Sequence, residues 1–189
     1  RKRTLKIRRA VSRMLGLIDN TLYISSLDSN TIKFNPDHVD IMELLNEIAQ
    51  RQRDVTQNAT ITLGCDVKGL QVYADSSLLE HIFSNLLSNS VKYCNEDPVI
   101  QIAVKAGETH AEIGVQDNGI GIPEVQQEEI FEVFKRAHVG KSYQGAGIGL
   151  AICKKVVERH GGSISVDSTP GEGTTFSFSL SYLPVQSVL

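Results

Sequence analysis

The chain has 189 residues, a formal net charge of −3 and 41% hydrophobic residues. This composition is typical of a soluble globular protein with one core and a short appended piece. The negative charge excludes a general nucleic-acid binder, because neutralising phosphates requires an excess of basic residues.

The cysteines and the apolar runs indicate the compartment. Cys65, Cys94 and Cys153 are far apart and lack CxxC spacing, which predicts idle thiols in a reducing environment. No apolar run reaches the roughly 18 to 20 residues that span a bilayer. The basic start, residues 1–9, is not followed by the apolar block of a signal peptide. We expect a cytoplasmic chain, and the pattern leaves open whether a longer parent is anchored in a membrane.

Residues 4–28 predict one long helix. Its apolar residues recur at steps of three and four and form a single stripe of Ile7, Val11, Met14, Ile18 and Leu22. A narrow stripe requires another helix, so we expect a homodimer or a bundle through residues 4–28. The alternative is a helix packed on its own domain. Residues 31–37 are expected to form a linker.

The next elements alternate between helix and strand. After a short β-like piece at 32–34, a helix is predicted over 39–53, followed by strands over 61–67 and 70–73 joined by Lys68-Gly69. A helix then begins at the caps Asp75 to Ser77 and extends to about Tyr93, with Ser77 and Glu80 fitting a capping box.

The remaining elements complete an α+β fold. Strands are predicted over 98–105, 109–116, 163–168 and 174–182, a short helical piece over 124–134, and a helix over 147–160 that Gly161-Gly162 ends. Hairpins outnumber βαβ units, which favours a two-layer sandwich with a mixed sheet and helices on one face.

Three glycine clusters follow one another in the second half of the chain, at 117–123, 145–150 and 171–176. Glycines let a backbone approach a ligand closely and expose N–H groups to anions. The middle cluster fails the GxGxxG spacing, and Gly140-Lys141-Ser142 lacks the first glycine of a Walker loop, because that position is Lys135. Gly147 and Gly149 still present N–H groups at a helix start, where phosphates bind well.

A polar stripe lies on the helix that precedes these clusters. Asn85, Asn89 and Lys92 are spaced by four and three residues, so they share one helix face. Such a stripe is often just solvated, but the rest of this helix is apolar, so its polar face is expected to meet something specific. Asparagine and phosphate oxygens suit octahedral magnesium. The chain therefore predicts a nucleotide site.

The order and wording of these motifs resemble the catalytic, ATP-binding domain of sensor histidine kinases, within the wider gyrase, chaperone and MutL ATPase group. The resemblance covers about residues 38 to 183, so we expect an ATP-binding catalytic domain over 38–189 with the Bergerat-type fold of this group. Residues 1–30 resemble part of the second helix of the kinase dimerisation hairpin.

The resemblance implies a role for each matching residue. Asn89 is expected to ligate Mg²⁺, with Asn85 near the phosphates and the metal, Lys92 on phosphate and Tyr93 beside the nucleotide. Asp117 is expected to accept the adenine amino group, and Arg136 to reach the terminal phosphate. The other expected ATP-binding residues are Gly119, Gly121 and Ile122 in the pocket, Gly145, Gly147, Gly149 and Leu150 on the phosphate side, and Thr174 or Thr175 at the adenine end.

The resemblance also implies an aromatic box at 130–134 that anchors a mobile lid over 135–144. Long irregular segments in compact domains are usually functional, which fits a lid.

One position separates kinase from hydrolase. The related ATPases carry a glutamate four residues before the metal asparagine, and this chain has Asn85 there. An amide cannot take a proton from water at neutral pH, so we expect ATP to be held without rapid hydrolysis.

The acceptor histidine of the family is not expected within this chain. That residue is normally followed by Glu or Asp, whereas the histidines here are followed by Val39, Ile82, Ala111, Val139 and Gly161. His81 and His160 are predicted to be surface residues of helices. The partners expected are the acceptor helix of the parent kinase, which would supply the histidine, and the receiver domain of a response regulator.

Three functions follow from the sequence. The favoured one is a catalytic fragment that transfers the γ-phosphoryl of ATP to an external histidine. The alternative is a non-catalytic ATP-binding module that docks partners through a nucleotide-gated lid. A water-hydrolysing ATPase is disfavoured by Asn85.

Overall fold

The computed structural model describes residues 2–29, 31–56, 58–94, 96–137 and 146–184. The chain divides into two compact units, residues 1–33 and residues 34–189.

The first unit is a single helix, α1 (Lys2–Asp28), as its apolar period indicates. The described part of its apolar stripe faces solvent: Val11, Met14, Ile18 and Leu22 are between 45% and 61% exposed. Among the described residues, no helix combines the length and the apolar character that crossing a membrane requires.

The second unit is built on a mixed five-stranded sheet with the strand order β2-β4-β5-β7-β6. Only the pair β2 and β4 is parallel; the other neighbours are antiparallel. The strands are β2 (Thr60–Cys65), β4 (Val99–Ala106), β5 (His110–Asp117), β6 (Ile164–Thr169) and β7 (Gly173–Ser181). A small second sheet pairs β1 (Asp37–Asp40) with β3 (Gln71–Ala74).

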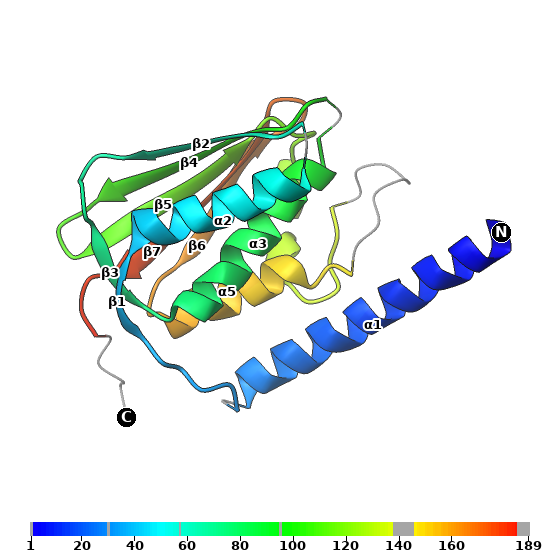
Figure 1. The fold of residues 1–189 in the computed structure, drawn as a ribbon, viewed down its shortest axis with the longest axis horizontal. Coiled ribbons are helices and arrows are strands. Elements are labelled where there is room, and N and C mark those ends of the chain that lie inside the picture. Colours follow the sequence, from blue (N-terminus) through cyan, green and yellow to red (C-terminus); the bar gives the residue numbers. More distant parts are fainter. Residues whose placement is uncertain (1, 30, 57, 95, 138–145, 185–189) are drawn as a thin grey trace. The chain divides into compact units, whose positions relative to one another are not determined.

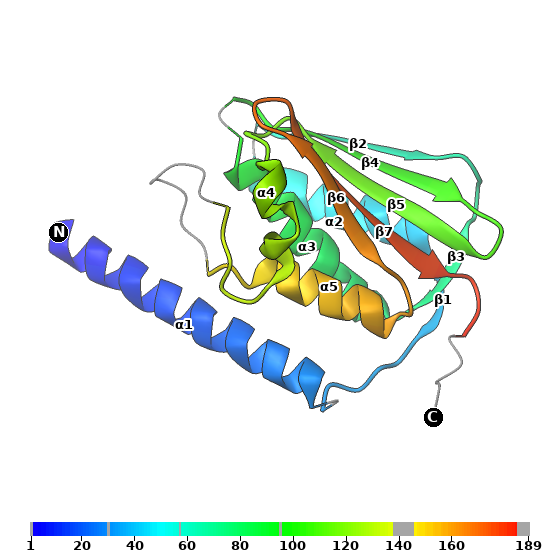
Figure 2. The same ribbon diagram turned by 180° about the vertical axis from the view of Figure 1, so that it is seen from behind.

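Helices α2 (Ile41–Val55), α3 (Ser76–Lys92) and α5 (Gly149–Arg159) cover one face of the large sheet (Figures 1 and 2). Burial alternates along β4 and β5, because successive side chains of a strand point to opposite faces. The core lies between the two layers, where Phe83 of α3 packs against Phe178 of β7 at 5.6 Å between ring centroids. The expected two-layer sandwich is confirmed. A short helix, α4 (Glu124–Gln127), and a 3₁₀ turn, η1 (Glu129–Phe131), follow β5.

The start of the second unit differs from the prediction. No strand forms at 32–34; the strand is β1, in which Val39 pairs with Val72. The helix expected from Val39 begins at Ile41, because the Asp40 carboxylate caps it by accepting hydrogen bonds from the N–H groups of Met42 and Glu43, each 3.0 Å long.

The two strands expected on either side of Lys68-Gly69 form as β2 and β3, and they belong to different sheets. The expected capping box of Ser77 and Glu80 was wrong, because it does not form. Asp75 caps α3 instead, and Glu80 binds Arg51 at 3.0 Å on the surface.

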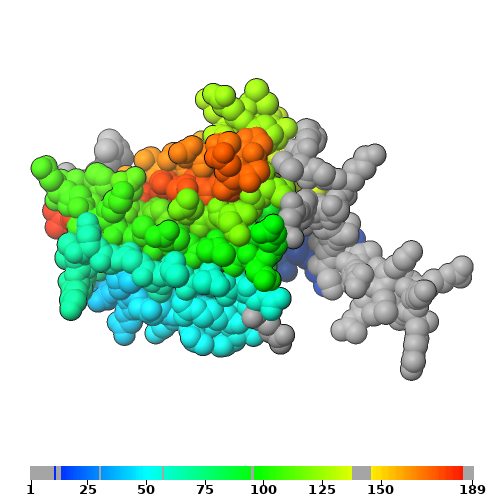
Figure 3. Space-filling view, turned by 90° about the horizontal axis from the view of Figure 1, so that it is seen from above, coloured from blue at the N-terminus to red at the C-terminus, as the bar shows by residue number. Residues whose placement is uncertain are grey.

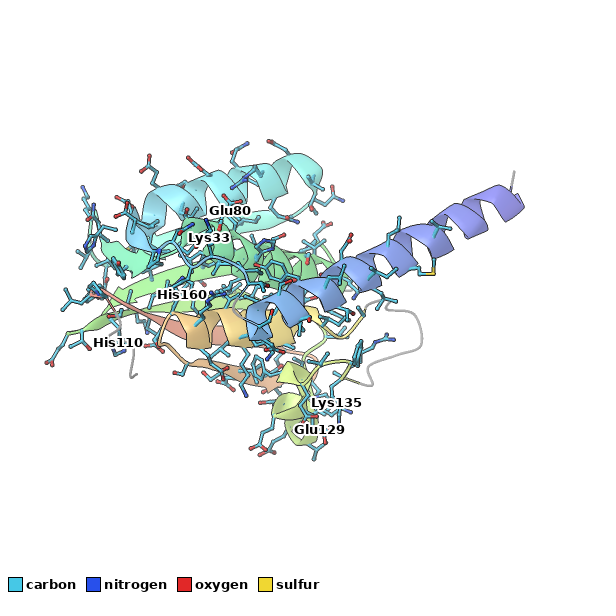
Figure 4. All side chains as sticks on the ribbon, turned by 90° about the horizontal axis from the view of Figure 1, so that it is seen from below. Lys33, Glu80, His110, Glu129, Lys135 and His160 are labelled. Atoms are coloured by element: carbon cyan, nitrogen blue, oxygen red, sulfur yellow. The ribbon has the colours of Figure 1, made fainter. Side chains whose placement is uncertain are left out.

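The prediction for His160 was also wrong, because this residue is 1% exposed and therefore buried (Figure 4). Its Nε2 accepts a hydrogen bond from the Asp75 N–H at 3.0 Å, and its Nδ1 lies 2.7 Å from the Val156 carbonyl. A carbonyl can only accept, so Nδ1 carries the proton of a neutral ring. His160 thereby ties the end of α5 to the start of α3. His81 is exposed, as expected.

We predict a loss of stability in mild acid through His160. Burial lowers its pKa; the Asp75 carboxylate acts in the opposite direction and Arg159 adds to the lowering. The unfolded ring takes up a proton near pH 6.5 and the folded ring only at lower pH, so the free energy of unfolding should fall as pH drops below about 6.5.

Urea unfolding at about pH 8 and about pH 5.5 measures this loss. His160→Gln should flatten the pH dependence, whereas the exposed control His81→Gln should leave it unchanged. An equal pH dependence in all three proteins would contradict the assignment to His160.

Candidate functional site

Asp117, the last residue of β5, is a carboxylate held in the core and 9% exposed. Its Oδ1 accepts hydrogen bonds from the N–H groups of Gly119 at 2.9 Å and Thr174 at 3.2 Å, and its Oδ2 accepts one from the Ser90 hydroxyl at 3.0 Å. An ionised carboxylate offers about four acceptor positions, so one remains free.

Burial raises the pKa of Asp117, and the three hydrogen bonds offset only part of that rise. Among the described residues, no cationic side chain forms an ion pair with it. A buried carboxylate without a cation is costly for the fold, and such groups are candidates for functional sites.

The loop after Asp117 is held in close contact on two sides. The Ile120 N–H donates to the Tyr93 carbonyl at the end of α3 (2.9 Å), and a Cβ on Gly119 would lie 2.8 Å from Asp117 Oδ1. Gly121 has φ +71, and a Cβ there would overlap the carbonyl of Thr169. These glycines are needed because the loop packs against backbone, and Ile122 beside them is half-buried.

The polar face of α3 carries the expected stripe, with all its members half-buried. The Asn85 amide donates to the His81 carbonyl at 2.9 Å, which leaves its Oδ1 pointing elsewhere. The Lys92 ammonium donates to the Tyr93 hydroxyl at 2.9 Å and lies 4.4 Å from the centre of that ring. Among the described residues, no hydrogen bond forms to the side chain of Asn89.

The start of α5 meets this face at Asn85. A Cβ on Gly149 would lie 2.7 Å from Asn85 Oδ1, so only glycine lets the first turn of α5 approach so closely. Helix starts expose unpaired N–H groups. The half-buried Leu150 follows, and Gly147 has φ +70 against the carbonyl of Lys135. Gly145 lies outside the described residues.

The segment before the expected lid is anchored at both ends. The Phe131 ring packs edge-on against Phe176 at 6.2 Å, and the Phe134 N–H donates to the Gly147 carbonyl at 2.7 Å. Lys135 pairs with Glu129 at 3.1 Å (Figure 4). Lys135 and Arg136 are the first two residues of the expected lid, and Arg136 is exposed. Residues 138–144 of the expected lid lie outside the described residues.

The structure separates the two threonines that the sequence left as alternatives. Thr174 is 7% exposed and pairs with Asp117 across β5 and β7. Thr175 points to the opposite face of the sheet, because side chains alternate along a strand. There it lines a groove of about 180 Å³ with Gln101, Lys105, Glu112 and other residues of β4, β5 and β7.

That groove lies on the open face of the sheet. Figure 3 shows this face, with the strand colours side by side and no described helix laid over them. It contains none of the other expected site residues, so this groove is not the candidate site.

The described residues form no cluster of three or more His, Cys, Asp or Glu side chains that could cage a metal.

Ser90 is a site residue that the sequence reasoning missed. It is 2% exposed, and its one hydroxyl proton is shared between Asp117 Oδ2 and the Leu86 carbonyl, each 3.0 Å away. The available signal was a serine four residues after Leu86 and three after Leu87, which puts it on the same apolar face of α3.

Residues 74–184 match the model of a family described as histidine kinase-, DNA gyrase B-, and HSP90-like ATPases. The chain belongs to this family. It is 39% identical over 187 residues to cyanobacterial phytochrome B of Nostoc, covering 95% of this chain and 24% of that protein. It is 32% identical to the sensor histidine kinase WalK of Bacillus subtilis, covering 90% of this chain and 29% of that protein. The chain thus spans about a quarter of the length of such relatives.

Solved structures place the domain in the histidine kinase branch of the family. The mycobacterial sensor histidine kinase MprB superimposes with a TM-score of 0.70 and 30% identity, over 79% of this chain and all of that one. The catalytic domain of histidine kinase ThkA has a TM-score of 0.70 and 26% identity, over 81% of this chain and all of that one. Full-length ShkA, at 24% identity and a TM-score of 0.81, shares the fold over 98% of this chain and 40% of its own.

Proposed function

We propose that this domain binds Mg-ATP between Asp117 and the polar face of α3, and transfers the γ-phosphoryl group to a histidine outside the chain. The observation that carries the proposal is the free acceptor position of the buried Asp117. An exocyclic amine such as that of adenine fits it, because an amine donates hydrogen bonds and adds no charge. Gly119, Gly121, Ile122 and Thr174 surround this end.

The phosphate end lies on α3 and the start of α5. Asn89 offers an amide oxygen for Mg²⁺, Lys92 an ammonium for phosphate, and Gly147 to Leu150 backbone N–H groups at a helix start. Bound magnesium neutralises phosphate charge and orients the transferred group. The Lys92 ammonium has three N–H donors, so it can bind phosphate while its hydrogen bond to the Tyr93 hydroxyl keeps it beside the site.

Asn85 and Arg136 are the residues proposed to act in catalysis. Asn85 Oδ1 faces Gly149 and cannot act as a base toward water, so its place next to the phosphates favours transfer over hydrolysis. The Arg136 guanidinium is positively charged and can stabilise the terminal phosphate. Catalysis then rests on positioning and charge.

The partners follow from the same proposal. The acceptor histidine comes from the dimerisation helix of the parent kinase, and the exposed stripe of α1 pairs with a second copy or a bundle helix. A response regulator receives the phosphoryl group next; ThkA has been crystallised with the response regulator protein TrrA. Because the proposed reaction consumes ATP, we expect the domain to act in the cytoplasm.

The test is phosphotransfer from labelled ATP to the dimerisation domain of the parent protein. Acid-labile, base-stable label on the acceptor histidine supports the proposal. ATP binding with no labelled histidine would favour a nucleotide-gated docking module instead. Steady release of phosphate from ATP would favour a water-hydrolysing ATPase.

Asn89→Ala should remove the magnesium dependence of binding. Loss of the amide oxygen leaves the metal to water and phosphate, so affinity for Mg-ATP should fall about tenfold toward the metal-free value. Calorimetric titration with and without Mg²⁺ measures this. The matched control is Asn46→Ala on the exposed side of α2, and an unchanged magnesium effect in Asn89→Ala would contradict the assignment.

A further inference from the structure

Two side chains hold the backbone of Ile122 on both sides. The Ile122 N–H donates to the Ser168 hydroxyl at 2.9 Å, and the Ile122 carbonyl accepts from Gln127 Nε2 at 3.0 Å. The second Gln127 hydrogen bond goes to the Ser168 carbonyl at 2.7 Å. Ser168 lies on β6 and Gln127 on α4, so two elements fix the loop at the peptide groups on either side of Ile122.

The Ser168 hydroxyl also determines how Thr174 is oriented. It lies 2.7 Å from the Gly173 carbonyl and 2.9 Å from Thr174 Oγ1. A carbonyl only accepts, so the single Ser168 proton goes to Gly173. The Thr174 proton then points to Ser168, and the lone pairs of Thr174 Oγ1 remain available as acceptors.

The β6–β7 turn and the strand that follows it form two further hydrogen bonds with the segment from Asp117 to Ile122. The Gly171 N–H donates to the Ile120 carbonyl at 2.8 Å, and the Thr174 N–H donates to Asp117 Oδ1. The rim from Asp117 to Ile122 is therefore one hydrogen-bonded unit with the β6–β7 turn, and Ser168 has three partners within it.

We propose that Ser168 and Gln127 are positioning residues that select a purine carrying a 6-amino group. Ser168 keeps Thr174 Oγ1 an acceptor next to Asp117, so two acceptors face the base and suit the two hydrogens of an amine, directly or through water. Gln127 keeps the Ile122 peptide in place beside them. This inference rests on the proposed function, since it names how the same site reads its base.

The test compares Ser168→Ala and Gln127→Glu with controls of the same chemistry on the open face of the sheet. Gln127→Glu replaces two donors by a carboxylate that faces two carbonyls, with little change in shape. Ser177→Ala and Gln101→Glu alter side chains that line the open-face groove. Calorimetry measures the affinity for a non-hydrolysable ATP analogue and for purine riboside triphosphate, which lacks the 6-amino group. Amide hydrogen exchange reports on Ile122 without nucleotide.

Both site variants should bind the ATP analogue about tenfold more weakly, the size of one lost hydrogen bond. The preference for ATP over purine riboside triphosphate should shrink in Ser168→Ala and be recovered in Ser168→Thr, which keeps the hydroxyl. Exchange at Ile122 should accelerate in both variants, and the two controls should behave as the wild type.

The contrary results are distinct. Faster exchange at Ile122 with unchanged affinity and base preference would overturn the positioning role and leave the proposed function intact. An equal loss of affinity for both nucleotides in Ser168→Ala would show that Ser168 is a structural residue, and this result would also overturn the positioning role. A wild-type chain that binds neither nucleotide would overturn the proposed function itself.

Discussion

Replacing Asp117 with asparagine should weaken ATP binding about 30- to 100-fold while raising the melting temperature of the domain. The affinity falls because the amide turns one acceptor into a donor, which opposes an adenine amine. The stability rises because burial raises the pKa of the Asp117 carboxyl, so the folded state favours its neutral form.

The sign follows from proton linkage. Below the ordinary aspartate pKa the carboxyl is neutral in both states. As pH rises from there through the higher folded pKa, the unfolded state ionises first and stability is lost. At neutral pH the wild type therefore carries a penalty that Asp117→Asn removes, the trade between stability and function common at binding sites.

Calorimetry and thermal unfolding near neutral pH measure the two effects. Asp167→Asn, at an exposed position of the edge strand β6 of the same sheet, is the control and should change neither quantity. If Asp117→Asn lowered the melting temperature, the carboxylate would be a structural group and the account of its burial would fail.

Gly173→Ala is expected to destabilise the fold severely, with a loss of about 4 kcal/mol or more. Gly173 has φ +113, and a Cβ there would overlap the carbonyl of Asp117 on the adjacent strand. The new Cβ is bonded directly to the backbone of β7, and the carbonyl belongs to the backbone of β5. Neither can therefore move without opening the pair of β5 and β7 at the site.

Gly171→Ala separates strain from overlap. Gly171 has φ +88, but a Cβ there meets no atom within 4 Å. It should cost about 1 to 2 kcal/mol, the strain of a non-glycine residue in this conformation. Urea unfolding measures both variants, and equal losses would show that the overlap with Asp117 contributes nothing.

The sequence was sufficient for elements whose pattern is local. The strand pair of β4 and β5 and the helix α3 follow from alternation and from apolar spacing, so their positions were predicted within a few residues. The resemblance was sufficient to predict the family and its fold, because the motifs occur in a fixed order.

Features set by tertiary contacts could not be predicted. His160 is buried because its ring accepts from Asp75, a residue far away in the chain, and nothing in the local pattern indicates that bond. Strand β1 forms only because β3 pairs with it. Ser90 and Ser168 have the chemistry of ordinary surface serines, and only the fold brings them to Asp117 and Thr174.

The choice between Thr174 and Thr175 illustrates the limit within the site. Both hydroxyls suit the adenine end, and the sequence alone does not fix which face of the strand meets the helices. The register Asp117 to Thr174 decides it, since a shift of one residue exchanges the two faces.

The most direct test of the central claim is a titration of the labelled domain with a non-hydrolysable Mg-ATP analogue, followed by backbone amide NMR. We expect the shifted amides to cluster at residues 117–122, at 89–93 on α3 and at 147–150, with those at Ala103 and Gly114 on the open face unchanged. Shifts confined to the open face, or no saturable shifts, would contradict a nucleotide site at Asp117.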